Sequence, residues 1–517
     1  MIIECLTLIV HAIGKEDSQS FIWPLIKLLM TLQESISDKS DPLKLYIIWG
    51  WQRLFLVLKH DLQTYLGGIL PPLLKLLTLV LTQQISEDKE EEINPEINSS
   101  VNLISTLIEE IGEDLNSNIL TLIQLILPIC TNSQLEDELR KTAAKTLSKT
   151  LETLKKVNEE ECKKYGIFFV NVLLQTISDE LEPTIIKELI IVIKDCIAIL
   201  GNYLNEVELS EVSKRIIKVI YDSDQRKDQE KNNNFEDVDS DEMELLKERI
   251  SNEEDLQIAV AQLIGILFKT HKNLCLKFAD FLYSEVILKV CNQNLSDKIH
   301  KLGLVLIDDM LEYLGREVLG EKFVKMAEIL AEFIVDPCCS VREAANYGVG
   351  LFASQAKEEF INFGETFIEK MIQALDIPQQ SDDKQRMFLH CRDNILAALG
   401  KIIYYQSEKV NFMRVLNIWV FNLPIRHEKY ECYFQHEFLA LMAWSKREMI
   451  FQDARLVEQV VKIFAEILDS KLSNHKIKSI IQLCLRKWIN EEKNQDIINI
   501  FQTLSPLQQK KIEDCLS

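Results

Sequence analysis

The stretch from Asp336 to Ala353 constrains the fold of this chain most strongly. It reads DPCCSVREAANYGVGLFA, in which Asp336-Pro337 turns the chain after one helix and Ser340 is expected to be the N-cap of the next. Beyond Ser340, small and apolar residues recur at three- and four-residue steps. This spacing predicts a helix whose buried stripe is small enough for another helix to lie close against it. The stretch is therefore typical of a unit that stacks on its neighbours, and not of a catalytic unit.

The same pattern recurs along the chain. Val341-Arg342 has counterparts in Leu139-Arg140 and in Ile299-His300, and 42 residues separate Ile299 from Val341. Repeats of about 40–47 residues that consist of two helices indicate a HEAT or armadillo array. We therefore predict an all-α fold, a right-handed superhelical solenoid of about ten HEAT helix pairs. First helices are expected on its convex face and second helices on its concave face.

Apolar periodicity divides the chain into three parts. Residues 1–221 are expected to form HEAT repeats, of which the first is incomplete because Ile2–Ile13 resembles a second helix without a first. We therefore expect the chain to begin partway through a longer solenoid. Residues 222–255 are acidic, rich in Asn and poor in apolar residues, and are predicted to form a mobile insertion. Residues 256–517 are expected to form further HEAT repeats with C-terminal capping helices.

Composition limits the classes of partner. The formal charge of −22 argues against a nucleic-acid backbone as the main partner, because phosphate binding needs clustered Lys and Arg. The charge is compatible with a basic protein partner, and equally with an acidic surface that only confers solubility. The 12 cysteines contain no C-x-x-C pair, which is typical of reduced thiols. No uncharged apolar run approaches the roughly 20 residues of a membrane span, so no membrane insertion is expected.

Several stretches resemble one known family. They include IIECLTLIVHAIGKE at the start, the SVREAANYGVGLFA stretch, LGLVLIDDMLEYLG at Leu302–Gly315, RDNILAALGKII at Arg392–Ile403, VLNIWVFNLPIRHEK at Val415–Lys429 and the final LSPLQQKKIEDCL. Together they are similar to the C-terminal half of importin-beta superfamily transport receptors, specifically of the importin-5 (karyopherin beta-3) branch. The resemblance covers nearly the whole chain, and the acidic insertion falls where the branch has one.

The resemblance implies a nuclear import receptor that works by binding and is not an enzyme. Its expected partners are basic cargo proteins, such as ribosomal proteins or histones, the GTPase Ran, and Phe-Gly nucleoporins. Such receptors shuttle between cytoplasm and nucleus through the nuclear pore and need no cofactor. Family receptors are roughly twice this length, and the N-terminal repeats with the main Ran contact have no counterpart here. We expect either a fragment, a truncated gene model or a reduced receptor.

Polar residues on the expected concave helices are candidate contacts for Lys/Arg-rich cargo, because carboxylates hold basic side chains by charge-assisted hydrogen bonds. An amide side chain could hold the backbone of an extended peptide. The candidate residues are Asp308, Asp309, Glu312, Asn346, Asn394, Glu109, Glu110 and Glu113, with Asp114 beside them. An ordinary solvated face for the acids, and a capping or surface role for the two Asn, remain alternatives.

Aromatic and metal-ligand patterns give weaker signals. Trp419 and Phe421, with Phe412 nearby, could form a groove for Phe-Gly nucleoporins, although aromatic residues at helical spacing usually pack in a core. His427, Cys432 and His436 have the spacing of metal ligands, but the sequence places no fourth ligand, so a structural role is the simpler interpretation and no metal is expected. No phosphate-binding Gly loop, nucleophile elbow or kinase signature is present.

Two other classes of function stay open. A HEAT protein of this composition could be a phosphatase scaffold subunit, or an assembly chaperone for basic proteins without a Ran-dependent transport role. An enzyme would require a concave pocket that gathers carboxylate, His and Cys side chains. For the acidic insertion Asp222–Asp255, occupation of the basic-cargo groove and a plain solvated loop are both compatible with the sequence.

Overall fold

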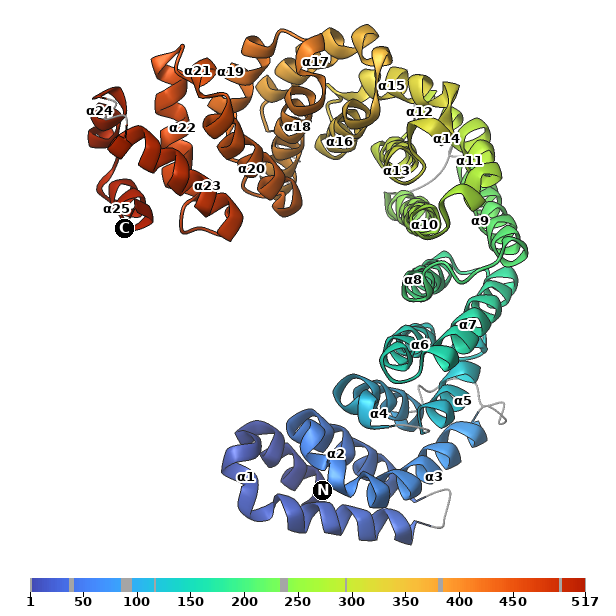
Figure 1. Ribbon diagram of the computed structural model, residues 1–517. Helices are drawn as coiled ribbons and strands as arrows, with labels where there is room; N and C mark the ends of the chain where they lie inside the picture. The colour runs from blue at the N-terminus through green and yellow to red at the C-terminus, as the bar shows by residue number, and fades with distance from the viewer. Residues whose placement is uncertain are drawn as a thin grey trace. The chain divides into compact units, whose positions relative to one another are not determined.

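The computed structural model describes residues 2–36, 41–84, 95–115, 118–232, 240–292, 295–379, 385–491 and 495–516. Within these ranges the secondary structure is helical, without a strand (Figure 1). The all-α prediction is therefore confirmed. The chain divides into two compact units, unit 1 from Met1 to Leu274 and unit 2 from Cys275 to Ser517.

Unit 1 contains two rows of stacked helices preceded by α1 (Ile2–Ser35), which bends at Gly14. In one row each helix contacts the next: α2 (Leu43–Leu58), α4 (Pro95–Ile111), α6 (Asp137–Val157), α8 (Pro183–Leu200) and α10 (Ser240–His271). The other row contains α3 (Leu66–Gln84), α5 (Asn118–Thr131), α7 (Glu159–Asp179) and α9 (Glu206–Asn232). Each helix pair covers its apolar face only against adjacent pairs, as in a repeat array.

Unit 2 continues the same layered pattern. Its first row contains α13 (Asp297–Tyr313), α16 (Cys339–Gln355), α18 (Gln385–Gln406), α20 (Lys429–Ser445) and α23 (His475–Arg486). Its second row contains α11 (Leu276–Leu282), α12 (Leu288–Asn292), α15 (Glu321–Phe333), α17 (Gly364–Asp376), α19 (Phe412–Asn422) and α22 (Ala454–Ile467). Short helices α14 (Gly315–Leu319) and α21 (Arg447–Ile450) lie in connections, and α24 (Gln495–Thr503) and α25 (Pro506–Leu516) pack on α22.

Helix α16 begins at Cys339, two residues earlier than an N-cap at Ser340 implies, so the expectation of an N-cap at Ser340 is wrong. Cys338 is the N-cap residue, and its backbone N–H donates to the Asp336 side chain at 2.8 Å in the turn before the helix. Arg342, which is 1% exposed, donates to the carbonyl oxygens of Asp336 (2.5 Å) and Pro337 (3.0 Å). The buried guanidinium therefore satisfies the carbonyl groups of the turn between α15 and α16.

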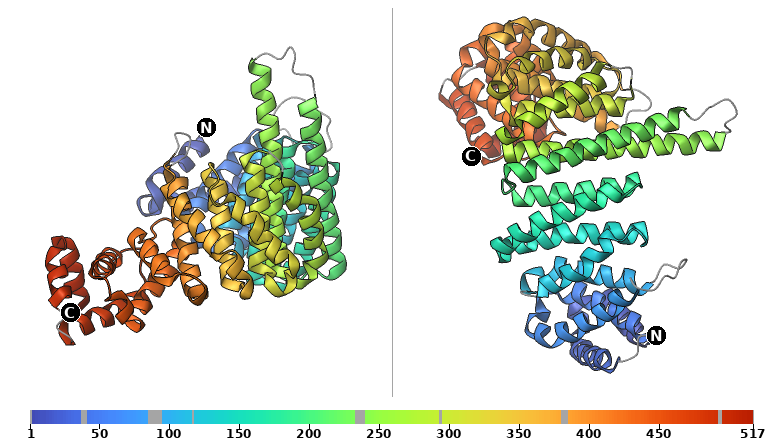
Figure 2. Two further views of the ribbon diagram at one scale, coloured as in Figure 1. Left: turned by 90° about the horizontal axis from the view of Figure 1, so that it is seen from above. Right: turned by 90° about the vertical axis from the view of Figure 1, so that its right-hand side faces the viewer.

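Most of the predicted loop at residues 222–255 is helical, which corrects that prediction. Helix α9 continues to Asn232 and α10 begins at Ser240, and both extend past the neighbouring helices (green in Figure 2). Polar contacts replace apolar anchors between them. Arg226 forms two hydrogen bonds with Glu253, at 2.5 and 3.0 Å, and Lys227 donates to Gln257 at 2.8 Å. Residues 233–239 lie outside the described part, and the three-part division of the chain stays a prediction.

The stretch Leu43–Leu81 is long and apolar enough to cross a membrane by composition, with a mean hydropathy of 1.6. It is not one continuous α-helix. Helix α2 ends at Leu58, and a 3-10 segment at Lys59–Tyr65 precedes α3. The side chains of Ile47 and Trp51 are fully buried within unit 1. The apolar residues of this stretch therefore supply the core between α2, α3 and their neighbours.

Close approach of helices α13 and α16 depends on Gly348. A Cβ atom at this position would lie 2.3 Å from Asp308 Oδ1 and 2.7 Å from Leu330 Cδ2. Gly67 in α3 is the matched position, because a Cβ atom there would meet nothing within 4 Å. Substitution of Gly348 tests the need for space between layers, whereas substitution of Gly67 measures only the general effect of glycine on helix stability.

We expect Gly348→Ala to lower the free energy of unfolding by about 1–3 kcal/mol, because the added methyl group overpacks the contact between α13 and α16. Gly67→Ala should raise it by about 0.5–1 kcal/mol, because alanine restricts the unfolded chain. Urea denaturation followed by far-ultraviolet circular dichroism measures both values. Equal effects of the two substitutions would show that the layers are not in close contact at Gly348.

Candidate functional site

Three acidic side chains, Asp308, Asp309 and Glu312, lie within one turn near the end of α13. The apolar stripe of this helix, with Ile307 and Leu311 fully buried, fixes its orientation and leaves the acids along one edge of the buried face. Asp308 is only 6% exposed, Asp309 is half-buried, and Glu312 is exposed. We call these three residues the α13 acidic group.

The carboxyl groups of the α13 acidic group have no cationic partner in the part of the chain that the structure describes. Within the described residues, none of its three carboxylates lies within 4.0 Å of a Lys or Arg nitrogen, and Asp308 Oδ1 has no hydrogen-bond partner. Burial, with the charges of Asp309 and Glu312 in addition, holds the pKa of Asp308 well above its usual range. Burial and the Glu312 charge raise the pKa of Asp309 to about 7. The group would therefore gain from a cation brought by a partner.

Side chains from the next two layers border this group. The Tyr347 hydroxyl on α16 donates to Glu312 Oε2 at 3.1 Å, and burial raises the pKa of this phenol. Lys401 on α18 lies with its Nζ 5.2 Å from the centre of the Tyr347 ring. However, Lys401 Nζ is already paired with Glu431 at 2.5 Å. The bordering lysine is therefore committed to another carboxylate and does not neutralise the α13 acidic group.

The second predicted acidic cluster, at the end of α4, is compensated by the chain itself. Glu109 is paired with Lys149 of α6, Glu110 with Lys59 at 2.9 Å, and Glu113 with Lys156 of α6 at 2.9 Å. Asp114 accepts hydrogen bonds from His60 and Gln63, both at 2.8 Å. These side chains join consecutive layers of unit 1. Their role in cargo binding stays a prediction, but the local charge of this cluster is largely neutralised.

The two candidate asparagines are not exposed, which corrects the expectation of a peptide-binding surface at these positions. Asn346 is fully buried, and its Nδ2 donates to the carbonyl oxygens of Arg342 (2.7 Å) and Ile334 (3.3 Å). It therefore ties the end of α15 to α16. Asn394 is 6% exposed and its Nδ2 lies 3.4 Å from Glu343 Oε1. Both amides make contacts between helices.

The expected groove of Trp419 and Phe421 is not formed, because the two residues point to opposite sides of α19. Trp419 is fully buried against Phe438, with ring centroids 5.4 Å apart, whereas Phe421 is 47% exposed. Residues two positions apart on a helix differ by about 200° in direction. Phe412, at the start of α19, is half-buried, and Lys446 Nζ lies 5.5 Å from the centre of its ring. Only Phe421 of the predicted pair is available to a partner.

Exposed aromatic residues that the sequence analysis did not single out lie on α18 and α20. Tyr404 and Tyr405 are 50% and 45% exposed, and Trp444 is 41% exposed. The Tyr404 ring centre lies 5.4 Å from that of Phe434 and 5.0 Å from that of Phe438. In the sequence, such residues can be recognised as aromatic residues that fall outside the buried stripe of a helix. The α20 segment is unusually rich in aromatic residues.

His436 and Cys432 have structural roles, as the simpler interpretation of the sequence proposed. His436 accepts the backbone N–H of Ile425 at Nε2 (3.2 Å) and donates from Nδ1 to the carbonyl oxygen of Leu472 (2.9 Å). Burial lowers the pKa of His436, which favours this neutral form. Cys432 Sγ lies 3.4 Å from the same Nδ1 atom. Both ring nitrogens are therefore used, and neither is free for a metal.

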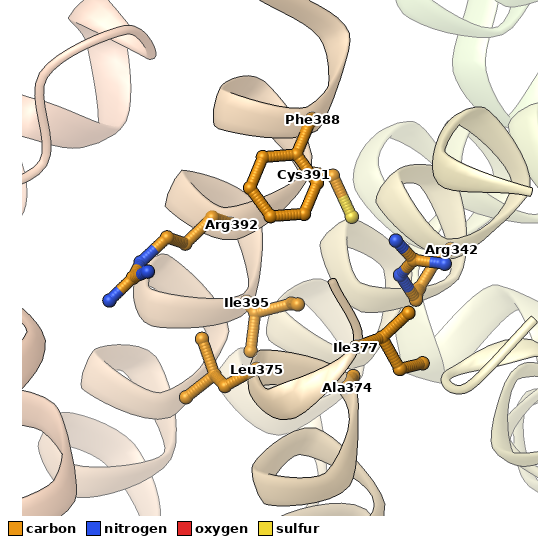
Figure 3. A pocket seen from close by; sticks show the side chains of 8 residues that line it. All are labelled: Arg342, Ala374, Leu375, Ile377, Phe388, Cys391, Arg392 and Ile395. Carbon is orange, nitrogen blue, oxygen red and sulfur yellow. The ribbon is translucent and has the colours of Figure 1, made fainter. Parts of the chain in front are cut away.

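A small pocket lies between α16, α17 and α18, with a volume of about 10 Å³. Its lining consists of Arg342, Ala374, Leu375, Ile377, Phe388, Cys391, Arg392 and Ile395, and the two arginines lie on opposite sides of the apolar residues (Figure 3). A space of this size holds about one water molecule. The lining contains neither a carboxylate nor a histidine, so this pocket lacks the residues that the enzyme alternative requires.

Known proteins match the chain along nearly all of its length. The family described as Importin repeat 6 matches residues 185–293. Importin subunit beta-3 of Saccharomyces cerevisiae is 22% identical over 529 aligned positions, which cover 96% of this chain and 47% of that protein. The structure of Kap121p bound to RanGTP has a TM-score of 0.75 at 19% identity, and covers 99% of this chain and 48% of its own. Kap121p bound to Nup53p has a TM-score of 0.76 at 19% identity and covers 99% and 47%.

The chain is similar to karyopherins of the importin-beta superfamily, in their importin-5 branch. The likeness to Kap121p also confirms the predicted fold class, a solenoid of HEAT repeats. The chain spans about half the length of the relatives it matches. Resemblance in sequence was therefore a correct guide to the fold, whereas the roles of individual residues depend on the contacts described above.

Asp309→Asn should make the chain more stable at pH 8 by on the order of 2 kcal/mol, with the difference disappearing as the pH falls below about 4. The sign follows from the raised pKa of Asp309, about 7 in the folded chain. The stability that the protonated Asp309 side chain allows is fully present below the pKa of Asp309 in the unfolded chain. It is lost as the pH rises through the pKa of Asp309 in the folded chain. Urea denaturation at several pH values measures the difference.

Asp280→Asn is the control for loss of a surface charge in unit 2, because Asp280 is exposed and paired with Lys322 at 2.7 Å. We expect it to change stability by less than about 1 kcal/mol, in the destabilising direction. If Asp309→Asn is destabilising at pH 8, the carboxylate of Asp309 is stabilised by an interaction that offsets its burial.

Proposed function

We propose that this chain acts as a nuclear import receptor of the importin-5 type, which binds basic cargo proteins and carries out no chemical step. The single observation that carries the cargo part is the α13 acidic group, three neighbouring carboxylates without a Lys or Arg partner among the described residues. A Lys or Arg side chain brought to these residues would stabilise their charged form. Support for transport as the function comes from the family match and from the relatives.

The contrast between the two acidic clusters supports this choice of site. Glu109, Glu110 and Glu113 already hold lysines of neighbouring layers, so a basic cargo would have to displace these lysines. Asp309 and Glu312 require no such exchange, since neither is paired with a Lys or Arg among the described residues and Glu312 accepts a hydrogen bond from the neutral Tyr347 hydroxyl. Electrostatic attraction to an uncompensated group also speeds association with a basic partner at low salt. Cargo is therefore proposed to bind over α13 and α16.

Regulation by RanGTP and passage through the nuclear pore are part of the proposal. Kap121p has been solved in complexes with RanGTP, with Nup53p and with Pho4p. Because this chain matches only about half of that protein, we propose these partners for the chain on the basis of family alone. Phe421, exposed on α19, is the candidate contact for Phe-Gly nucleoporins. Shuttling between cytoplasm and nucleus would follow from these interactions.

A scaffold or assembly chaperone for basic proteins is the alternative, and the same acidic group favours it. Such a protein would bind basic partners over α13 but would bind neither RanGTP nor Phe-Gly repeats. Pull-down of the chain with immobilised RanGTP, with RanGDP as control, and with a Phe-Gly peptide separates the two. Binding of RanGTP but not RanGDP, or binding of the Phe-Gly peptide that depends on its Phe residues, supports the proposal of an import receptor. If the chain binds neither ligand, that proposal is contradicted.

Replacing both accessible acids of the group, Asp309→Asn with Glu312→Gln, should weaken binding of a fluorescent Lys-rich peptide by about tenfold or more at low ionic strength, or about 1.4 kcal/mol. The loss should shrink as salt is added, because the interaction is electrostatic. The matched control is Glu109→Gln with Glu113→Gln, which removes two carboxylates from the compensated cluster and should change the dissociation constant by less than about threefold.

Fluorescence anisotropy measures these constants, and circular dichroism verifies that all variants are folded. Equal losses in the two double variants would mean that binding responds to net charge alone. A larger loss in the α4 variant would place the cargo site in unit 1.

A further inference from the structure

A cluster of potential metal ligands lies where three layers of unit 2 meet. Glu343 on α16, His390 on α18 and Glu428, the residue before α20, each offer one ligand atom, and the three atoms lie within 4.8 Å of one another. All three side chains are half-buried. Among the described residues, no other group of this kind occurs. No sequence motif indicates this cluster, because the three residues lie 47 and 38 positions apart.

Neighbouring side chains hold these ligands in place. His390 Nδ1 is hydrogen-bonded to Glu428 Oε1. The buried Asp393 carboxylate accepts the backbone N–H groups of Arg426 (3.0 Å) and Glu428 (3.1 Å), which fixes the loop that carries Glu428. On the other side, Asn394 Nδ2 lies 3.4 Å from Glu343 Oε1. Such supporting hydrogen bonds are what orients carboxylate and imidazole ligands in metal sites.

We propose that Glu343, His390 and Glu428 form a binding site for a divalent transition metal ion, of which Zn²⁺ is the best match. One imidazole nitrogen and two carboxylate oxygens are ligands that Zn²⁺ accepts, and water would complete a four-coordinate site. Ligand-to-metal distances of about 2.0–2.2 Å place two ligand atoms of a tetrahedral ion about 3.4 Å apart, so the hydrogen-bonded His390 Nδ1 and Glu428 Oε1 atoms must separate to admit the ion. The two glutamate side chains are only half-buried, and rotation about their side-chain bonds allows such a movement.

Binding changes the protonation of His390 without a net change in its charge. In the metal-free site, Arg386 Nε lies 3.3 Å from His390 Nε2 and Nδ1 faces Glu428, so the ring proton is assigned to Nδ1. A metal at Nδ1 displaces this proton to solvent, and Nε2 takes up another. The exposed Arg386 side chain must then turn away, because it can no longer donate to Nε2.

Two cations oppose the metal and limit its affinity. Lys301 Nζ lies 3.8 Å from Glu343 Oε2, and Arg386 lies beside His390. Both side chains are long and reach solvent, so they can move rather than block the site. We therefore expect a dissociation constant in the micromolar range. A bound ion would join α16, α18 and the start of α20, next to Tyr347 one turn further along α16.

The site has a matched control in unit 1. There, His60 Nδ1 is 2.8 Å from Asp114 Oδ2, a histidine–carboxylate pair that has no third ligand within reach in the described part of the chain. If a pair of this kind were sufficient for binding, the two positions would behave alike. Glu343→Gln is the sharpest substitution, because it keeps size and the contact with Asn394 while removing one anionic ligand.

The test is competition of the full chain with a chromophoric chelator for Zn²⁺, together with visible absorption of Co²⁺ in its place. We expect one site per chain, at least tenfold weaker binding in Glu343→Gln and in His390→Gln, and wild-type binding in His60→Gln. Saturating Zn²⁺ should raise the melting temperature of the wild type but not of Glu343→Gln, and circular dichroism without metal verifies that the variants fold.

Three outcomes would overturn the proposal. The first is the absence of Zn²⁺ binding at micromolar concentrations. The second is equal binding by wild type and Glu343→Gln. The third is a Co²⁺ spectrum dominated by thiolate charge transfer, which would place the metal on one of the accessible cysteines, such as Cys5. These results would leave the proposed transport function untouched, because it depends on α13 and not on this cluster.

Discussion

Each helix pair of this chain depends on its neighbours to cover its apolar face. Helix α16 shows this most clearly, because it contacts α13 on one side and α18 on the other. The absence of a side chain at Gly348 lets α13 approach until Asp308 lies against the backbone of α16. The burial that raises the pKa of Asp308 and Asp309 is therefore a direct result of the close stacking of layers.

The acidic residues of the chain fall into two physical classes. Many join one layer to the next, as in the pairs of Lys44 with Glu96 at 2.9 Å and of Lys145 with Glu188 at 3.2 Å. The α13 acidic group has no such partner among the described residues. A net charge of −22 therefore says little about where a basic protein binds. Compensation within the structure, which composition does not reveal, distinguishes an acid that holds layers together from one that is available to a partner.

The helix pairs could be predicted from sequence, because a buried stripe repeats with the period of the helix in every layer. The positions of Asp309 and Glu312 next to that stripe could also be predicted. Contacts between layers could not be predicted, because they depend on the register of residues about 40–50 positions apart. The pairings of Glu109 with Lys149 and of Lys145 with Glu188 are examples. The prediction of a groove formed by Trp419 and Phe421 was wrong for a simpler reason, because their two-residue spacing already places them on opposite faces of α19.

The most direct measurement of the central claim is proton release when a Lys-rich peptide binds. Calorimetry at pH 7 in two buffers with different ionisation enthalpies gives the number of protons exchanged. Since the pKa of Asp309 is about 7 in the free chain, a cation beside it should lower this pKa and release a fraction of a proton. The release should disappear in Asp309→Asn. Binding without proton release, or release unchanged in that variant, would contradict the view that packing of α13 on α16 creates the binding site.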